Sequence, residues 1–194
     1  MLLAIAVVVV AIIGAVTFVV VDDNSASTGS AAVAGGGKAA VDGVATVGER
    51  APDFELQTFD GDTVRLSDYA GKPVVVNFWA SYCHPCREEF PMFRKALARH
   101  DDDFVLLGID YKDITSDART FAKEKRATWP ILKDPDDAVA LAYGVRAVPQ
   151  TFFIARDGTI SQRYYAQVPD DVFEEELAKI AKPLATPATT VPPR

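Results

Sequence analysis

The chain has 194 residues, about half of them hydrophobic, and a net charge of −7, which suits one domain of ordinary size with further segments outside its core. The acidic balance and the lack of any run of three Lys or Arg disfavour binding to a phosphate backbone, so we expect no nucleic-acid partner. Only two cysteines occur, Cys83 and Cys86, which excludes a scaffold of several disulfides.

Residues 1–21 contain no charged side chain and are dominated by Val, Ile, Ala and Leu. A helix of this length, rising about 1.5 Å per residue, reaches roughly 30 Å and would cross a bilayer. We therefore predict a transmembrane anchor over residues 1–21. A signal peptide is the alternative, but no Lys or Arg precedes the apolar run, and the small-residue segment Ala32-Val33-Ala34 lies well beyond it.

Two further segments are expected to lie outside the fold. Residues 22–46 are rich in Ala, Gly, Ser and Val without sustained periodicity, which predicts a flexible linker. Residues 183–194 are rich in Pro, Thr and Ala, a composition that buries too little apolar surface to order itself. Residues 47–182 remain as one expected domain.

Apolar periodicity predicts alternating strands and helices across this domain. Two short alternating segments around Asp60-Gly61 predict a β-hairpin, and the apolar run Val74–Ala80 predicts a central strand covered on both faces. The other expected elements are a helix over 85–99, a strand over 104–110, helices over 117–126 and 136–143, a hairpin of strands 150–155 and 159–165, and a helix over 170–181. This order predicts an α/β fold in which helices sandwich a mixed sheet.

The motif Cys83-His84-Pro85-Cys86 lies where the expected central strand gives way to a helix. The free N–H groups and positive dipole end of a helix start favour thiolate over thiol, so we predict Cys83 as the attacking nucleophile. Cys86 lies one turn later on the same face and is the expected resolving thiol. A purely structural disulfide explains the pair poorly, because so small a loop contributes little stabilisation.

Metal binding is the main non-redox alternative for the two thiols. A zinc site normally needs four ligands, and the other candidates are only His84, inside the motif, and His100, whose three following aspartates indicate a solvated helix end. A copper-binding assembly protein suits soft thiolates but would require a distant third ligand. We therefore expect no metal, and no cofactor beyond a redox-active Cys83–Cys86 disulfide.

Residues 78–91, FWASYCHPCREEFP, resemble the active-site segment of the membrane-anchored, thioredoxin-like TlpA/ResA/CcmG (DsbE-type) thiol-disulfide oxidoreductases. The resemblance extends over about residues 47–182, including Ala51-Pro52-Asp53-Phe54 and residues 143–152. It implies a thioredoxin fold with an N-terminal β-hairpin extension and an N-terminal transmembrane helix.

The same resemblance implies roles for residues around the motif. Pro149 matches a cis proline that lies against the CxxC and leaves the backbone of Val148 free to pair with an extended substrate. Asn77 stands where ordinary thioredoxins carry a buried aspartate, and Glu89 matches a functional glutamate of the family. A carboxyl buried there would have a raised pKa and could exchange protons with Cys86. The alternative is that Glu89 is an ordinary charged side chain on the surface.

Three aromatic or imidazole side chains complete the expected site. Tyr82 is predicted to face the substrate. Trp79 is predicted to frame the substrate site, with core packing as the alternative. His84 either stabilises the Cys83 thiolate and contacts substrate or simply lies in solvent.

Together these features predict an enzyme that exchanges protein disulfides, held in the cell membrane by one span with its catalytic domain extracytoplasmic, or secreted after signal cleavage. The resemblance implies a reductase acting on proteins such as apocytochrome c and re-reduced by a membrane thiol carrier. A disulfide oxidase is the alternative, because whether the protein reduces or oxidises its substrates depends on its reduction potential against theirs. A peroxiredoxin-like thiol peroxidase is disfavoured, since Ala80 and Val76 stand where its active-site hydroxyl residue and proline should be.

Overall fold

The computed structural model describes Val41, residues 43–100 and residues 103–182. Its elements are β1 (Glu55–Thr58), β2 (Thr63–Arg65), the 3₁₀ helix η1 (Leu66–Tyr69), β3 (Val74–Trp79), α2 (His84–His100), β4 (Val105–Asp110), α3 (Thr115–Glu124), β5 (Ile131–Lys133), α4 (Ala138–Ala142), β6 (Gln150–Ile154), β7 (Ile160–Tyr164) and α5 (Asp170–Ile180). The predicted transmembrane segment, most of the predicted linker and the C-terminal tail lie outside the described residues. Within the described part of the chain, no helix combines the length and apolar character needed to cross a bilayer.

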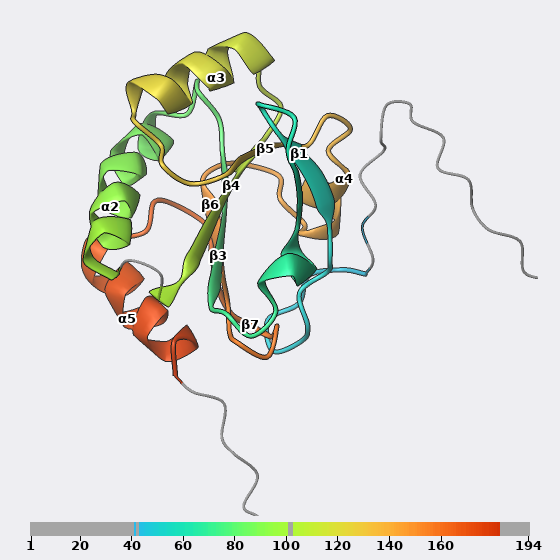
Figure 1. Cartoon of the computed structure of the whole chain (residues 1–194), viewed down its shortest axis with the longest axis vertical. Helices are drawn as coiled ribbons and strands as arrows, with labels where there is room; N and C mark the ends of the chain where they lie inside the picture. Colours follow the sequence, from blue (N-terminus) through green and yellow to red (C-terminus); the bar gives the residue numbers. More distant parts are fainter. Residues whose placement is uncertain (1–40, 42, 101–102, 183–194) are drawn as a thin grey trace, which may run out of the picture. The chain divides into compact units, whose positions relative to one another are not determined.

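The seven strands form one mixed sheet in the order β2-β1-β5-β4-β3-β6-β7 (Figure 1). At its centre, β3 pairs in parallel with β4 and antiparallel with β6. The antiparallel pair β1 and β2 extends the sheet beyond β5. Helices α2, α3 and α5 pack on one face of the sheet and α4 on the other, so the predicted α/β sandwich is confirmed.

Strand β3 is the centre of the core because all six of its residues are buried. Its alternating side chains serve two layers: Val75 and Trp79 join the cluster under α2, while Val76 and Phe78 join the cluster that includes α4. A strand covered on both faces is apolar on both sides, which explains the almost unbroken apolar run in the sequence, interrupted at Asn77. The end of β3 is therefore a rigid point from which the next residues project.

The structure differs from the sequence expectations at short or non-local features. Strand β5 was not predicted, because its three residues are held by pairing with β4 and β1 rather than by a local pattern. Helix α3 begins and ends two residues earlier than expected, and Arg126 beyond it has a positive φ of 54°. His100 does end α2, but its ring is only partly exposed, because its Nε2 lies 2.7 Å from Glu174 Oε2 of α5.

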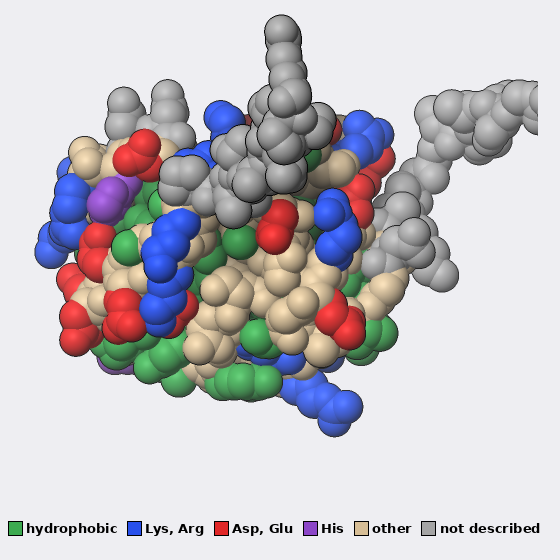
Figure 2. Space-filling view, turned by 90° about the horizontal axis from the view of Figure 1, so that it is seen from below, with side chains coloured by type: hydrophobic (Ala, Val, Ile, Leu, Met, Phe, Trp, Pro, Cys, Tyr) green, Lys and Arg blue, Asp and Glu red, His purple; other side chains and the backbone are tan. Residues whose placement is uncertain are grey.

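On the face shown in Figure 2, acidic and basic side chains are interspersed, and neither sign gathers into one extended patch. A surface with mixed charges produces only a weak long-range field. The described side chains visible on this face therefore offer no extended basic patch to a polyanion.

Candidate active site

The two cysteines lie at the start of α2, just beyond the end of β3. They form a disulfide, with Cys83 immediately before the helix and Cys86 in its first turn. The backbone N–H of Cys86 donates to Cys83 Sγ at 3.2 Å, a contact that would stabilise negative charge on this sulfur. Cys86 is completely buried, whereas Cys83 keeps 6% of its surface exposed. Cys83 is thus the sulfur that an external thiol or disulfide can approach.

Glu89 lies about one helical turn after Cys86 and is buried, with 1% of its surface exposed. Its Oε1 accepts a hydrogen bond of 2.8 Å from the backbone N–H of Val168, and its Oε2 accepts one of 3.4 Å from Asn77 Nδ2. Burial raises the pKa of Glu89 to about 7, although the two hydrogen bonds oppose this rise. The alternative of a surface charge is therefore wrong, and Glu89 can gain or lose a proton near neutral pH.

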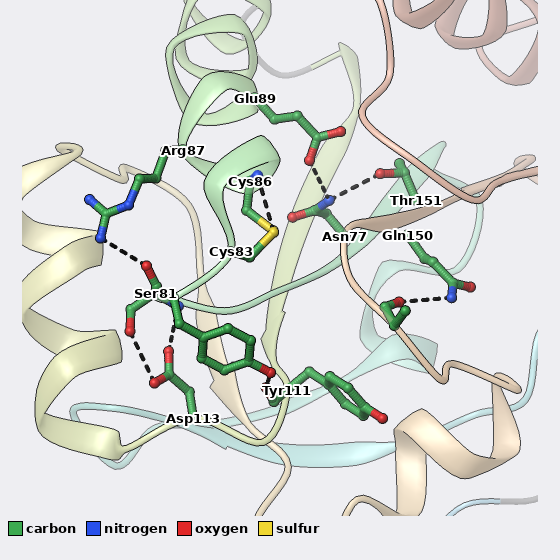
Figure 3. The surroundings of a disulfide bond; sticks show 12 residues. Asn77, Ser81, Cys83, Cys86, Arg87, Glu89, Tyr111, Asp113, Gln150 and Thr151 are labelled. Carbon is green, nitrogen blue, oxygen red and sulfur yellow. Dashed lines mark hydrogen bonds between the residues drawn. A yellow bond between two sulfur atoms is a disulfide. The ribbon is translucent and has the colours of Figure 1, made fainter.

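Asn77 connects Glu89 to the neighbouring strand. Its Nδ2 also donates to Thr151 Oγ1 at 3.0 Å, and the two residues are register partners across β3 and β6. Figure 3 shows the resulting chain of three buried polar side chains, Glu89, Asn77 and Thr151, on one side of the disulfide. The sequence drew attention to Asn77 and Glu89 separately, but Thr151 was missed because only the pairing of β3 with β6 brings it there.

The Val148–Pro149 peptide bond is cis, as the family resemblance implied. Pro149 is buried and Val148 is partly buried. The loop ends at Gln150, which is paired with Phe78 near the end of β3, so it reaches the edge of the sheet where the CxxC lies. Gln150 also fixes this loop, because its Nε2 donates to the carbonyl oxygen of Ala147 at 2.8 Å.

The three remaining predicted side chains lie in different environments. Tyr82 is 63% exposed beside Cys83 and His84 is exposed, so both can meet a substrate. Trp79 has no exposed surface, and its indole stacks on Phe121 with ring centroids 5.1 Å apart. The prediction that Trp79 binds substrate is corrected accordingly: its indole belongs to the core under the site.

Two carboxyl groups from the end of β4 and the following loop were missed in the sequence. Asp113 contacts Ser81 in the turn before the CxxC. Asp110 is 7% exposed, its Oδ1 has no hydrogen-bond partner among the described residues, and burial raises its pKa to about 7, helped by the charges of Asp113 and Asp134. The sequence contained one signal, the strand–helix–strand order over residues 74–110, which favours a parallel pair whose carboxyl ends share one edge of the sheet. The structure places Trp79 opposite Asp110 in this pair.

Comparison with known proteins agrees with this geometry. Residues 47–163 match the model of the AhpC/TSA family. Thiol-disulfide oxidoreductase ResA of Geobacillus thermodenitrificans is 33% identical over 135 residues, covering 69% of this chain and 78% of the relative. Thiol:disulfide interchange protein DsbE of Pseudomonas fluorescens is 35% identical over 134 residues, covering 68% and 74%. A crystal structure from Chlorobium tepidum, described as a DsbE thiol:disulfide interchange protein, superposes with a TM-score of 0.67 at 30% identity, covering 71% of this chain and 99% of that one.

Proposed function

The chain belongs to the AhpC/TSA family and, within it, to the thioredoxin-fold thiol-disulfide oxidoreductases of the ResA and DsbE type, and from this premise we propose that it reduces disulfide bonds in extracytoplasmic proteins. The observation that carries the mechanism is the placement of the buried carboxyl of Glu89 one helical turn from the fully buried Cys86. A shielded resolving thiol needs a proton acceptor inside the protein, and Glu89 is suited to that role.

The first step is attack on the substrate. In the reduced enzyme, the Cys83 thiolate attacks one sulfur of a substrate disulfide, that S–S bond breaks, and one substrate thiolate leaves. A mixed disulfide then joins Cys83 to the substrate. The start of α2 and the backbone N–H of Cys86 favour the thiolate that begins this step.

The second step releases the substrate. Cys86 transfers its proton to the Glu89 carboxylate and attacks Cys83 Sγ, forming the intramolecular disulfide as the bond to the substrate breaks. The second substrate thiolate leaves and takes up the proton that Glu89 received, while the first substrate thiolate takes up a proton from solvent. The substrate has gained two electrons and two protons, and the enzyme returns to its dithiol form by exchange with a membrane thiol carrier that supplies the same electrons and protons.

A protein substrate is supported by the surroundings of Cys83. Tyr82 is 63% exposed and Ile114 is 66% exposed, on two loops that the contact between Ser81 and Asp113 holds together. Exposed apolar side chains beside a reactive group are typical of a surface that receives another polypeptide. In this proposal the backbone of Val148 before Pro149 pairs with an extended substrate segment, His84 contacts it as well, and apocytochrome c before haem attachment is one such substrate.

The composition of the N-terminal region supports an extracytoplasmic site of action. The uncharged apolar residues 1–21 suit a membrane anchor, and the Ala- and Gly-rich residues 22–46 suit a flexible linker between that anchor and the domain. Substrate disulfides persist on the oxidising side of such a membrane.

Fractionation of cells tests the proposed anchor, since an anchored chain stays with the membrane in high salt, whereas a cleaved and secreted chain does not.

Trapping with Cys86→Ser tests the exchange activity directly. Without the resolving thiol, Cys83 should remain bound to its substrates in mixed disulfides, which mass spectrometry identifies after affinity purification. The control is Cys83→Ser, which keeps Cys86 but should trap none of these partners. We expect extracytoplasmic proteins with cysteine pairs, apocytochrome c among them. A Cys86→Ser variant that captures no partner through Cys83 contradicts the proposal.

The proton role of Glu89 has its own test, the substitution Glu89→Gln. The amide keeps the shape of the side chain but accepts no proton, so release of substrate from the mixed disulfide should slow by about 10² or more near neutral pH. Glu88→Gln, which changes an exposed neighbour, is the matched control. Rapid-mixing measurements of both steps separate attack from release, and an unchanged release rate in Glu89→Gln rules this role out.

A further inference from the structure

Every polar group of Ser81, in the turn between β3 and α2, has a partner from outside the turn. Its backbone N–H donates to the Asp113 carboxylate, and its hydroxyl donates to Asp113 Oδ1 at 3.0 Å. Its carbonyl oxygen accepts a hydrogen bond of 2.8 Å from Arg87 Nη2. A turn residue bound at all three positions has little freedom to move relative to its partners.

The two partners of Ser81 are themselves fixed. Asp113 Oδ1 also accepts a 2.7 Å hydrogen bond from the backbone N–H of Ile114, just before α3. The guanidinium carbon of Arg87 lies 4.9 Å from the centre of the Phe121 ring in α3. The contacts of Asp113 and Arg87 thus hold the turn against the loop after β4 and against α3. Neither element takes part in the proton chemistry of Glu89.

Ser81 lies only two residues before Cys83, so the position of the turn determines the position of the nucleophile. The N–H of Cys83 donates to the carbonyl oxygen of Ala80 at 3.2 Å, within the same turn. Figure 3 shows the disulfide between two separate groups of side chains, with Glu89 and Asn77 on one side and Ser81, Asp113 and Arg87 on the other. The second group is not explained by proton transfer.

We propose that Asp113 is a positioning residue that, through Ser81, holds the turn carrying Cys83 in the geometry required for attack on a substrate disulfide. This inference rests on the proposed exchange function and adds a residue to it. Displacement of a reacting group by about 1 Å can slow a reaction by about 10². Asp113 touches no reacting atom, so its effect should appear in the attack step and not in release.

The test measures the attack step alone. In the full chain carrying Cys86→Ser, the reduced protein reacts with a small chromogenic aryl disulfide, and rates are expressed per Cys83 thiolate, whose fraction is measured by ultraviolet absorbance. Asp113→Ala should lower the rate about tenfold or more, and Ser81→Ala should lower it less. Asp113→Asn should recover part of the loss, because its carbonyl oxygen can still accept one bond from Ser81. Asp117→Ala, an exposed carboxylate in α3, is the control expected to match the parent.

The double variant separates positioning from general damage. Because the Ser81 hydroxyl acts only through Asp113, adding Ser81→Ala to Asp113→Ala should slow the reaction no further. Parent rates in folded Asp113→Ala and Ser81→Ala, or losses that multiply in the double variant, overturn the inference. If Asp113→Ala does not fold, the Ser81→Ala variant tests the inference by itself. An attack rate equal to that of the parent then overturns the inference. A parent chain that exchanges with no disulfide would instead contradict the proposed function.

Discussion

At the scale of single residues, Glu89 shows how burial shapes both stability and chemistry. The folded protein raises the pKa of this carboxyl from 4.5 to about 7, so between these values the folded state holds a proton that the unfolded chain has released. The free energy of unfolding therefore falls as pH rises through this window and changes no further above the folded-state pKa. The same carboxyl is the proposed proton acceptor of Cys86, so the cost in stability accompanies its proposed chemical role.

We predict that Glu89→Gln flattens the dependence of stability on pH. Between about pH 5 and about pH 8, the parent should lose about 2 to 3 kcal/mol more of its free energy of unfolding than the variant. Urea denaturation of the oxidised proteins at both pH values measures this difference. Asp110, whose pKa is also raised to about 7, contributes equally to both proteins. Parallel stability profiles for parent and variant would show that Glu89 is ionised alike in both states.

The sequence reveals residues of the site only where a local motif points to them. Cys83, Cys86 and Glu89 stand at fixed helical spacing, so the motif and its continuation predict them. Asp113 and Thr151 reach the site through other elements, one after β4 and one on β6, and nothing in the segment around the cysteines points to them. Side chains brought together by sheet pairing need the strand order before they can be assigned.

At the scale of elements, β4 depends on the absence of a side chain at Gly108. A Cβ there would lie 3.0 Å from both Trp129 Nε1 and Ile131 Cδ1, and 3.2 Å from Trp79 Nε1. The glycine thus leaves room beside β4 for the Nε1 atoms of both indoles. The long apolar strands and amphipathic helices were predictable from periodicity, whereas β5 was not, since its three residues are held by pairing with β1 and β4.

Gly108→Ala is expected to destabilise the domain by about 1 to 3 kcal/mol, because the neighbouring rings and Ile131 cannot all withdraw from a packed core. Thermal and urea unfolding measure this change. Ser161→Ala on β7, which alters an exposed side chain, should stay within about 0.5 kcal/mol of the parent. Equal stability of Gly108→Ala and the parent would mean that the two indoles rearrange freely.

At the scale of the whole molecule, the fold and the disulfide belong to one thermodynamic cycle. If the folded protein is more stable with the disulfide formed than with it reduced, folding favours the oxidised form and lowers the reduction potential. Strong oxidants show the reverse, since their reduced forms are the more stable ones. The relative stability of the two forms therefore reports whether the reduction potential is low, as suits a reductase, or high, as suits an oxidase.

For the proposed reductase, we predict that the oxidised chain unfolds at higher urea concentration than the reduced chain. A difference of about 1.4 kcal/mol corresponds to about 30 mV in reduction potential. The control is the variant with both Cys83→Ser and Cys86→Ser, whose unfolding should not respond to reductant. A reduced form that is the more stable one would favour the oxidase alternative.

The strand order also has a consequence for how the protein meets unfolded polypeptides. The two outermost strands could recruit such chains indiscriminately, because an open sheet edge offers unpaired backbone groups. Here β2 has only three residues, and the start of β7 is covered, since the backbones of Gly48 and Glu49 both bond to Ile160. A client chain therefore finds little to adhere to along the sheet margins. In the proposed mechanism, clients instead meet the loop before Pro149 and the exposed side chains beside Cys83, such as Tyr82.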